Sequence, residues 1–147
     1  MKVRWLDHIH VHCSNTAESK RFYTEVLQAE PIGQALSSRG QMMEFVRLGG
    51  LTLVLAPFPP GMEPAVPPPY GDGAYRHGFG VAHFGLSVEN LHEAVASLRR
   101  LGAKILGEPK ENAGLRYAYL GAPDGVIIEL LQHGGKWAAL LGPPRPT

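Results

Sequence analysis

Three histidines stand at alternate positions near the start of the chain, in the segment LDHIHVHC at residues 6–13. In a β-strand this spacing places His8, His10 and His12 on one face. Imidazole nitrogens bind divalent metals, but they also line polar cavities or simply face solvent. The segment therefore leaves three interpretations open, namely a metal site, a polar lining, or the polar face of an ordinary strand.

Two further polar side chains stand within apolar segments of the second half. His83 lies in VAHFGLSV (residues 81–88), and Glu129 is the only acid in GVIIELLQ (residues 125–132). A carboxylate in such a strand is costly to bury unless a cation or a hydrogen-bond donor accompanies it. Together with one histidine of the first segment, these residues would form a set of two imidazoles and one carboxylate, a ligand set that leaves positions open for water and substrate. Spacing alone does not show that they converge, since a single strand histidine is more often an ordinary hydrogen-bonded residue.

The order of predicted elements is the same in both halves of the chain, which indicates a tandem repeat. Each half predicts a strand, a helix and three strands. The predicted ranges in the first half are 3–13, a helix over 14–28, then 31–36, 41–48 and 51–57. Those in the second half are 81–88, a helix over 89–102, then 104–108, 115–121 and 126–133. The apolar helix faces are predicted to be Phe22, Val26 and Leu27 in the first half and Leu91, Val95 and Leu98 in the second.

A segment rich in proline and glycine separates the two halves. We expect a first module at residues 1–57, a connecting loop at 58–80, a second module at 81–133 and a tail at 134–147. The loop carries Tyr70, Tyr75, Arg76 and His77. It is either a lid over a functional site or a stiff connection between the modules.

Composition excludes several classes of function. The 147 residues include 14 basic and 13 acidic side chains, and no basic stripe is interleaved with aromatic residues, so we expect no nucleic-acid partner. No apolar run approaches the roughly 20 residues that cross a bilayer. The single cysteine, Cys13, cannot form an intramolecular disulfide and fits a reducing compartment. These features predict a cytoplasmic protein without a membrane partner.

The chain resembles the vicinal oxygen chelate superfamily, which includes glyoxalase I, extradiol dioxygenases, fosfomycin-resistance transferases and bleomycin-binding proteins. The resemblance rests on LDHIHVHC, SKRFYTEVLQAEP, VAHFGLSVENL and APDGVIIELLQ. It implies an α+β fold in which two βαβββ modules pair into a curved mixed-sheet cup around a divalent metal. By the same resemblance, His8, His83 and Glu129 are the metal ligands.

One departure from the family pattern bears on the reaction. Glyoxalase I and methylmalonyl-CoA epimerase usually place a fourth ligand in the last strand of the first module, where this chain has LTLVLAPF, and the matching position is Val54. Three ligands resemble an extradiol dioxygenase or a fosfomycin-type transferase instead. Extradiol enzymes also carry a tyrosine near the position of Tyr119 and a histidine acid/base, for which His77, His10 or His12 are candidates. Tyr119 also fits an ordinary strand aromatic, and His10 and His12 fit a cavity lining.

The resemblance implies a metal-dependent enzyme, and a non-haem Fe(II) ring-cleavage dioxygenase acting on a small oxygenated substrate is favoured. We expect Tyr119 and His77 to be the catalytic side chains, and Fe(II) to be the cofactor, with Mn, Zn, Ni or Co as alternatives. The alternative functions are a glyoxalase-like isomerase or lyase, a thiol transferase, and a metal-free binding protein of the bleomycin-resistance type. A homodimer is expected, with the site either within one chain or shared between subunits.

Overall fold

The computed structural model describes residues 6–63, 79–135 and 137–138. These residues form two compact units, residues 6–63 and residues 79–138. Much of the predicted connecting loop, with Tyr70, Tyr75, Arg76 and His77, lies outside the described residues. The pairing of the two modules into a cup stays a prediction.

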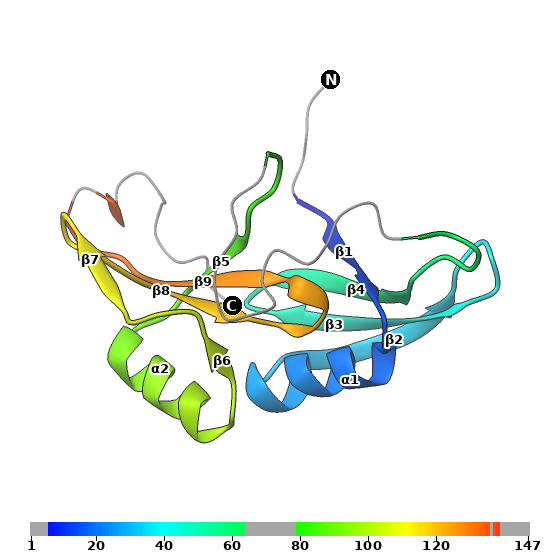
Figure 1. The fold of residues 1–147 in the computed structure, drawn as a ribbon, viewed down its shortest axis with the longest axis horizontal. Coiled ribbons are helices and arrows are strands. Elements are labelled where there is room, and N and C mark those ends of the chain that lie inside the picture. Colours follow the sequence, from blue (N-terminus) through cyan, green and yellow to red (C-terminus); the bar gives the residue numbers. More distant parts are fainter. Residues whose placement is uncertain (1–5, 64–78, 136, 139–147) are drawn as a thin grey trace. The chain divides into compact units, whose positions relative to one another are not determined.

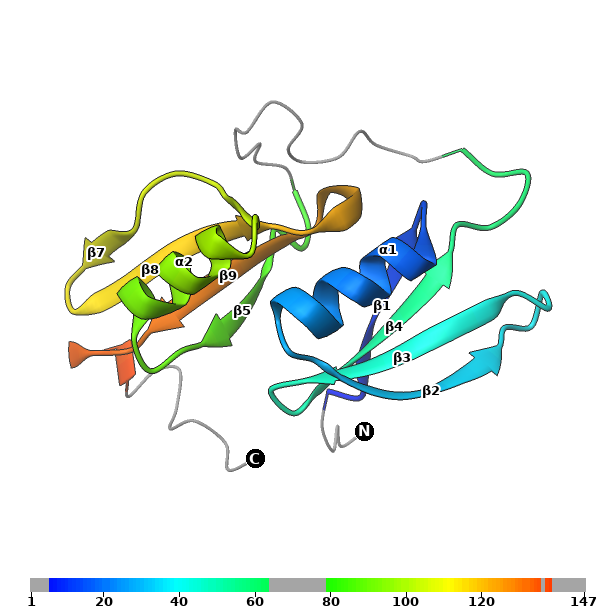
Figure 2. The same cartoon turned by 90° about the horizontal axis from the view of Figure 1, so that it is seen from below.

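The first unit is a four-stranded mixed sheet with one helix (Figures 1 and 2). The strand order is β1-β4-β3-β2, in which β1 runs parallel to β4 and the other neighbours are antiparallel. Two turns with glycines at positive φ join its antiparallel strands: Gly40 has φ 72°, and Gly49 and Gly50 have φ 54° and 81°. Positive φ at these positions requires glycine, or a residue with little steric penalty. The strands are β1 (His8–Cys13), β2 (Glu30–Leu36), β3 (Met42–Leu48) and β4 (Leu51–Pro57).

The helical segment of the first unit begins with a side-chain cap. The side chain of Asn15 accepts a hydrogen bond of 3.1 Å from the backbone N–H of Glu18, which starts α1 (Thr16–Arg21). A π-helical turn, η1 (Phe22–Val26), continues it. Tyr23 and Ser19 are fully buried, whereas Phe22, Val26 and Leu27 are only half-buried, so the predicted apolar face is wrong by about one position.

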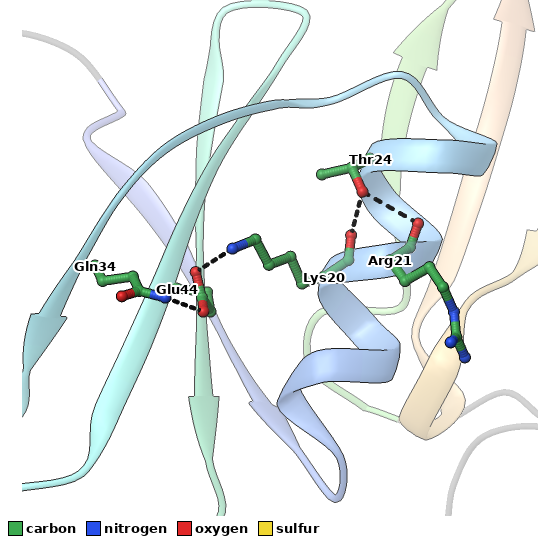
Figure 3. A network of polar contacts seen from close by, with 5 residues as sticks. All are labelled: Lys20, Arg21, Thr24, Gln34 and Glu44. Atoms are coloured by element: carbon green, nitrogen blue, oxygen red, sulfur yellow. Dashed lines mark hydrogen bonds and ion pairs between the residues drawn. The ribbon is translucent and has the colours of Figure 1, made fainter.

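A polar network fixes α1 against the sheet (Figure 3). Lys20 Nζ lies 2.8 Å from Glu44 Oε2 on β3, and Gln34 Nε2 on β2 donates a 2.6 Å hydrogen bond to Glu44 Oε1. The contact assigns Glu44 and the alternate positions of β3 to the face that α1 covers. Phe45 consequently lies on the opposite face, as does its β4 partner Val54.

The second unit repeats this arrangement with one additional strand. Its order is β5-β9-β8-β6, with β7 also paired to β8, and β5 runs parallel to β9. The turn before β9 is a short 3-10 segment, η2 (Pro123–Gly125), in which Asp124 has φ 58°. The strands are β5 (Phe84–Ser87), β6 (Lys104–Ile105), β7 (Lys110–Asn112), β8 (Leu115–Gly121) and β9 (Ile127–Gln132).

The helix of the second unit matches the prediction closely. Its N-cap is Asn90, whose side chain accepts a 3.2 Å hydrogen bond from the N–H of Glu93, and α2 spans Leu91–Arg100. Leu91, Val95 and Leu98 are buried, as their helical spacing predicts. Gln132 Oε1 on β9 accepts a hydrogen bond from the N–H of Leu91. The even-numbered residues of β9 therefore face α2, and Glu129 lies on the other face.

The order of strand, helix and three further strands is confirmed in the first unit, the second unit adds one strand to it, and the α+β class is confirmed. Three predicted boundaries differ by three or more residues. Strand β1 begins at His8, β5 begins at Phe84 rather than residue 81, and β6 ends at Ile105, after which the short β7 is an element that was not predicted. Among the described residues, no helix has the length and apolar character needed to span a membrane.

Candidate metal centre

His83 and Glu129 lie side by side on the face of the second sheet that points away from α2. His83 Nε2 is 3.2 Å from Glu129 Oε2. Glu129 pairs with Gly85 across the parallel β5–β9 ladder, and His83 stands two residues before Gly85. Both side chains are largely buried, with 28% of His83 and 15% of Glu129 exposed. The carboxylate that the sequence places among apolar residues thus has a partner.

The spacing of these two atoms suits ligands of one metal ion. Donor atoms bound at about 2.1 Å lie about 3.0 Å apart at octahedral angles and about 3.4 Å apart at tetrahedral angles. The observed 3.2 Å falls between these values. Imidazole nitrogen with carboxylate oxygen is a donor set for Fe, Mn, Zn, Co or Ni. The donors present therefore fit a divalent transition metal.

Tyr119 completes a polar cluster around this pair. It stands directly opposite Glu129 in the antiparallel β8–β9 ladder. Its ring centroid lies 5.4 Å from that of His83, in an edge-to-face contact. Tyr117 follows on the same face of β8, with its ring centroid 5.8 Å from that of Tyr119. The structure thus places the predicted catalytic tyrosine beside two of the three predicted ligands.

His8, the third predicted ligand, belongs to the first unit. Its Nδ1 lies 2.7 Å from Asp7 Oδ1. A carboxylate at this nitrogen favours the tautomer in which Nδ1 carries the proton, and that tautomer leaves the lone pair of Nε2 available. Consecutive side chains within a β-strand point to opposite faces, which would separate Asp7 from His8. Asp7 lies just before β1 begins, and its side chain therefore contacts the ring of His8.

A cavity of about 480 Å³ lies beside His8 within the first unit. Its floor is the face of the sheet away from α1, and it is bounded by the 37–38 turn. Apolar side chains form much of the wall, and hydroxyl and imidazole groups supply polar contacts. Residues that line it include His8, His10, Ser37, Phe45, Thr52 and Val54.

The three histidines of β1 form a row along the same face. The ring centroids of His8 and His10 are 6.4 Å apart, and those of His10 and His12 are 5.0 Å apart. Partial burial lowers the pKa of His10 below its ordinary value, and the neighbouring imidazoles of His12 and His8 lower it further. His10 is therefore favoured in its neutral form.

Corresponding positions of the two sheets carry different side chains. His10, two residues after His8, pairs with Val54, as Gly85, two residues after His83, pairs with Glu129. Val54 therefore occupies the register position of Glu129. By the same comparison, Phe45 opposite Val54 corresponds to Tyr119 opposite Glu129. The first module keeps the histidine and replaces the acid and the tyrosine with apolar residues.

The structure thus brings His83, Glu129 and Tyr119 together and places His8 beside a cavity in the other unit. Taken by itself, neither unit gathers three or more His, Cys, Asp or Glu side chains into a group able to hold a metal, as far as the described residues go. His77, the predicted acid/base, lies outside the described residues. The convergence of His8 with the other two ligands stays a prediction.

Sequence reasoning did not identify Asp7, Tyr117 or Phe45 as parts of these sites. The position of Asp7 directly before a candidate ligand histidine was a signal that could have identified it. The two-residue spacing from Tyr119 was a signal for Tyr117. Phe45 required the strand register, because nothing in its local sequence distinguishes it from a core aromatic.

Comparison with known proteins agrees with this arrangement. The chain belongs to the Glyoxalase/Bleomycin resistance protein/Dioxygenase superfamily, whose model matches residues 5–130. A lactoylglutathione lyase of Arabidopsis thaliana is 33% identical over 67 residues. That match covers 44% of this chain and 24% of the relative, so the chain covers well under two thirds of that protein.

Solved structures share the fold at low sequence identity. TnmS3, an antibiotic-binding protein from Streptomyces sp. CB03234, is 22% identical with a TM-score of 0.68, over 91% of this chain and 99% of that one. A variant of the fosfomycin resistance protein FosX from Listeria monocytogenes is 17% identical with a TM-score of 0.65, over 96% and 100%. The structure of that variant is a complex with Mn(II) and 1S,2S-dihydroxypropylphosphonic acid.

Proposed function

We propose that this protein is a metal-dependent enzyme that acts on a small oxygenated substrate, with His8, His83 and Glu129 as the metal ligands. The observation that supports this most directly is the 3.2 Å separation of His83 Nε2 and Glu129 Oε2 at the level of Tyr119. A strand carboxylate is rarely placed in an apolar setting without a role that offsets its desolvation.

His8 is proposed as the third ligand for two reasons. Its Nδ1 faces Asp7, so its Nε2 is available for a metal. It also occupies the place in the first module that His83 occupies in the second, as the strand register indicates. The three side chains meet in this proposal either within one chain or between two copies.

Each remaining group has a defined part in this proposal. A bound divalent ion would supply Lewis-acid polarisation of a substrate oxygen or, as Fe(II), the redox chemistry of a two-histidine, one-carboxylate centre. The Tyr119 hydroxyl donates a hydrogen bond to a substrate oxygen and positions it. The apolar wall that includes Phe45 and Val54 excludes water from the substrate. His77 is the proposed acid/base, although it lies outside the described residues.

Within this class we favour an Fe(II) ring-cleavage dioxygenase. Three protein ligands in an octahedral site leave three positions, enough for a substrate that binds through two oxygens and for O2. Val54 at the register position of Glu129 supports a three-ligand set. A glyoxalase-like isomerase or lyase and a thiol transferase are the alternatives within the same metal-dependent class.

A metal-free binding protein is the second candidate. The ion pair between His83 and Glu129 satisfies both groups without a metal, and the 480 Å³ cavity has room for a small ligand. In that case the cavity, rather than the polar cluster, would carry the function. Metal content separates the two candidates.

An activity screen tests the proposed reaction. Protein stripped with a chelator and reloaded anaerobically with Fe(II) is expected to consume O2 when catechols are added. His83→Ala is expected to abolish uptake, whereas His92→Ala, which removes an exposed histidine of α2, is expected to retain it. Turnover of a hemithioacetal or of an epoxide with a thiol, without O2 uptake, would support the alternatives. Inactivity with every metal and all three substrate types would contradict the enzyme.

The homodimer and the cytoplasmic location are carried forward as predictions. Light scattering on the purified protein reports the first, and fractionation of the source cells reports the second. A shared site would require two copies for full metal binding, so metal affinity would fall at concentrations at which the dimer dissociates.

A further inference from the structure

Two histidines of β1 are not used by the proposed centre. His10 and His12 are both exposed and lie on the same face of the strand. Their ring centroids are 5.0 Å apart and their planes are inclined by 59°. In a tetrahedral site with Zn–N bonds of about 2.0–2.1 Å, the centroids of two rings bound to one ion lie about 5 Å apart. The pair thus has the spacing of a two-histidine chelate.

The nitrogens of both rings are available. Within the described part of the chain, neither ring takes part in a hydrogen bond or an ion pair, in contrast to His8, which faces Asp7. Their partners across the ladder are Val54 and Ala56, which offer no charged side chain. Two apolar neighbours leave the imidazoles without competing partners for their lone pairs.

The backbone and one aromatic contact hold the pair in place. Strand β1 pairs along its whole length with β4, so the Cα positions of the two histidines are fixed by the sheet. The ring of His12 packs edge-to-face against Phe58, with centroids 5.4 Å apart. Little side-chain freedom is then lost when a metal binds, which favours chelation over the binding of a single histidine.

We propose that His10 and His12 form a second metal site, specific for ions that prefer imidazole, such as Zn²⁺, with water in the remaining positions. The site is independent of the proposed centre, since it uses neither His8 nor His83 nor Glu129. Copper and nickel are expected to bind it as well, because imidazole sites follow the general order of affinity of these ions.

Equilibrium dialysis of tag-free protein against Zn²⁺, at one slightly alkaline pH, tests this proposal. The Glu129→Ala chain weakens the proposed centre and is expected to retain one bound zinc. In that background, His10→Gln and His12→Gln are each expected to weaken the remaining site by about tenfold or more. His92→Gln removes a lone exposed histidine and is expected to change nothing. Circular dichroism reports that each variant is folded.

Two results would overturn the proposal. One is unchanged zinc affinity in His10→Gln and His12→Gln, and the other is an equal loss in His92→Gln, which would indicate binding to scattered histidines. NMR on the Glu129→Ala chain gives a readout without a substitution in β1, since substoichiometric Zn²⁺ is expected to shift the imidazole signals of His10 and His12 before that of His92. Two zinc ions retained in Glu129→Ala would contradict the proposed centre and leave the second site standing.

Discussion

Val54 occupies in the first sheet the register position that Glu129 occupies in the second. Each stands on the last strand of its unit, paired with the residue two positions after a histidine. The repeat thus offers the same backbone position twice and fills it once with an acid and once with valine. In the proposed account this difference sets the number of protein ligands at three and leaves the remaining metal positions to substrate.

Replacing Val54 by glutamate is expected to add a fourth ligand. Val54 is buried, so the new carboxylate should destabilise the metal-free protein by about 1–3 kcal/mol. Bound metal should restore stability, because ligands that bind only the folded state raise its unfolding free energy. Thermal unfolding with and without Mn²⁺ measures both effects, and activity on a substrate that needs several open positions should fall.

The matched control for this substitution is Val54→Thr. It keeps the shape of the side chain and adds a polar group, but supplies no carboxylate. A metal-induced rise in melting temperature that is the same in Val54→Glu, Val54→Thr and the unmodified protein would show that residue 54 does not approach the metal.

Asp7→Asn is expected to weaken metal binding without abolishing it. The carboxylate holds Nδ1 of His8 at 2.7 Å, and its loss removes the preference for the tautomer that presents Nε2. Loss of a hydrogen-bond partner of a ligand histidine typically lowers metal affinity by about 10- to 100-fold. Because 79% of the Asp7 side chain is exposed, we expect a loss of affinity of about tenfold. Competition with a chelating dye measures the affinity. An unchanged affinity, together with a large loss in His8→Ala, would mean that Asp7 does not orient the ligand.

Tyr119→Phe is expected to lower kcat/KM by about tenfold and to leave metal content unchanged, since one neutral hydrogen bond to the substrate is worth about 0.5–1.5 kcal/mol. Tyr117→Phe makes the same chemical change on the same face of β8, and it should have little effect. Equal losses in the two variants would argue against a specific role for Tyr119.

Local sequence patterns predicted most of the fold. Alternation in polarity located β1, and helical spacing identified Leu91, Val95 and Leu98 as the buried face of α2. The first helix shows the limit of this approach. The fully buried positions are Ser19 and Tyr23, at ordinary helical spacing, and a buried serine carries no hydrophobic signal by which the sequence could have placed this face.

The candidate site was predictable only in part. An acid within an apolar strand identified Glu129, and the family resemblance connected it to His83, beside which the structure places it. The Asp7–His8 contact and the correspondence of Phe45 with Tyr119 depend on a strand boundary and on register. Both are set by pairing between distant segments, which a single segment does not encode.

Metal content tests the central claim most directly. Protein purified without chelator is expected to carry about one tightly bound divalent ion per chain, and Glu129→Ala is expected to lose it. Glu111→Ala, which removes an exposed carboxylate paired with Arg116, should retain the ion. Equal metal content in the unmodified protein and in Glu129→Ala, whether substantial or negligible, would contradict the proposal that Glu129 is a metal ligand.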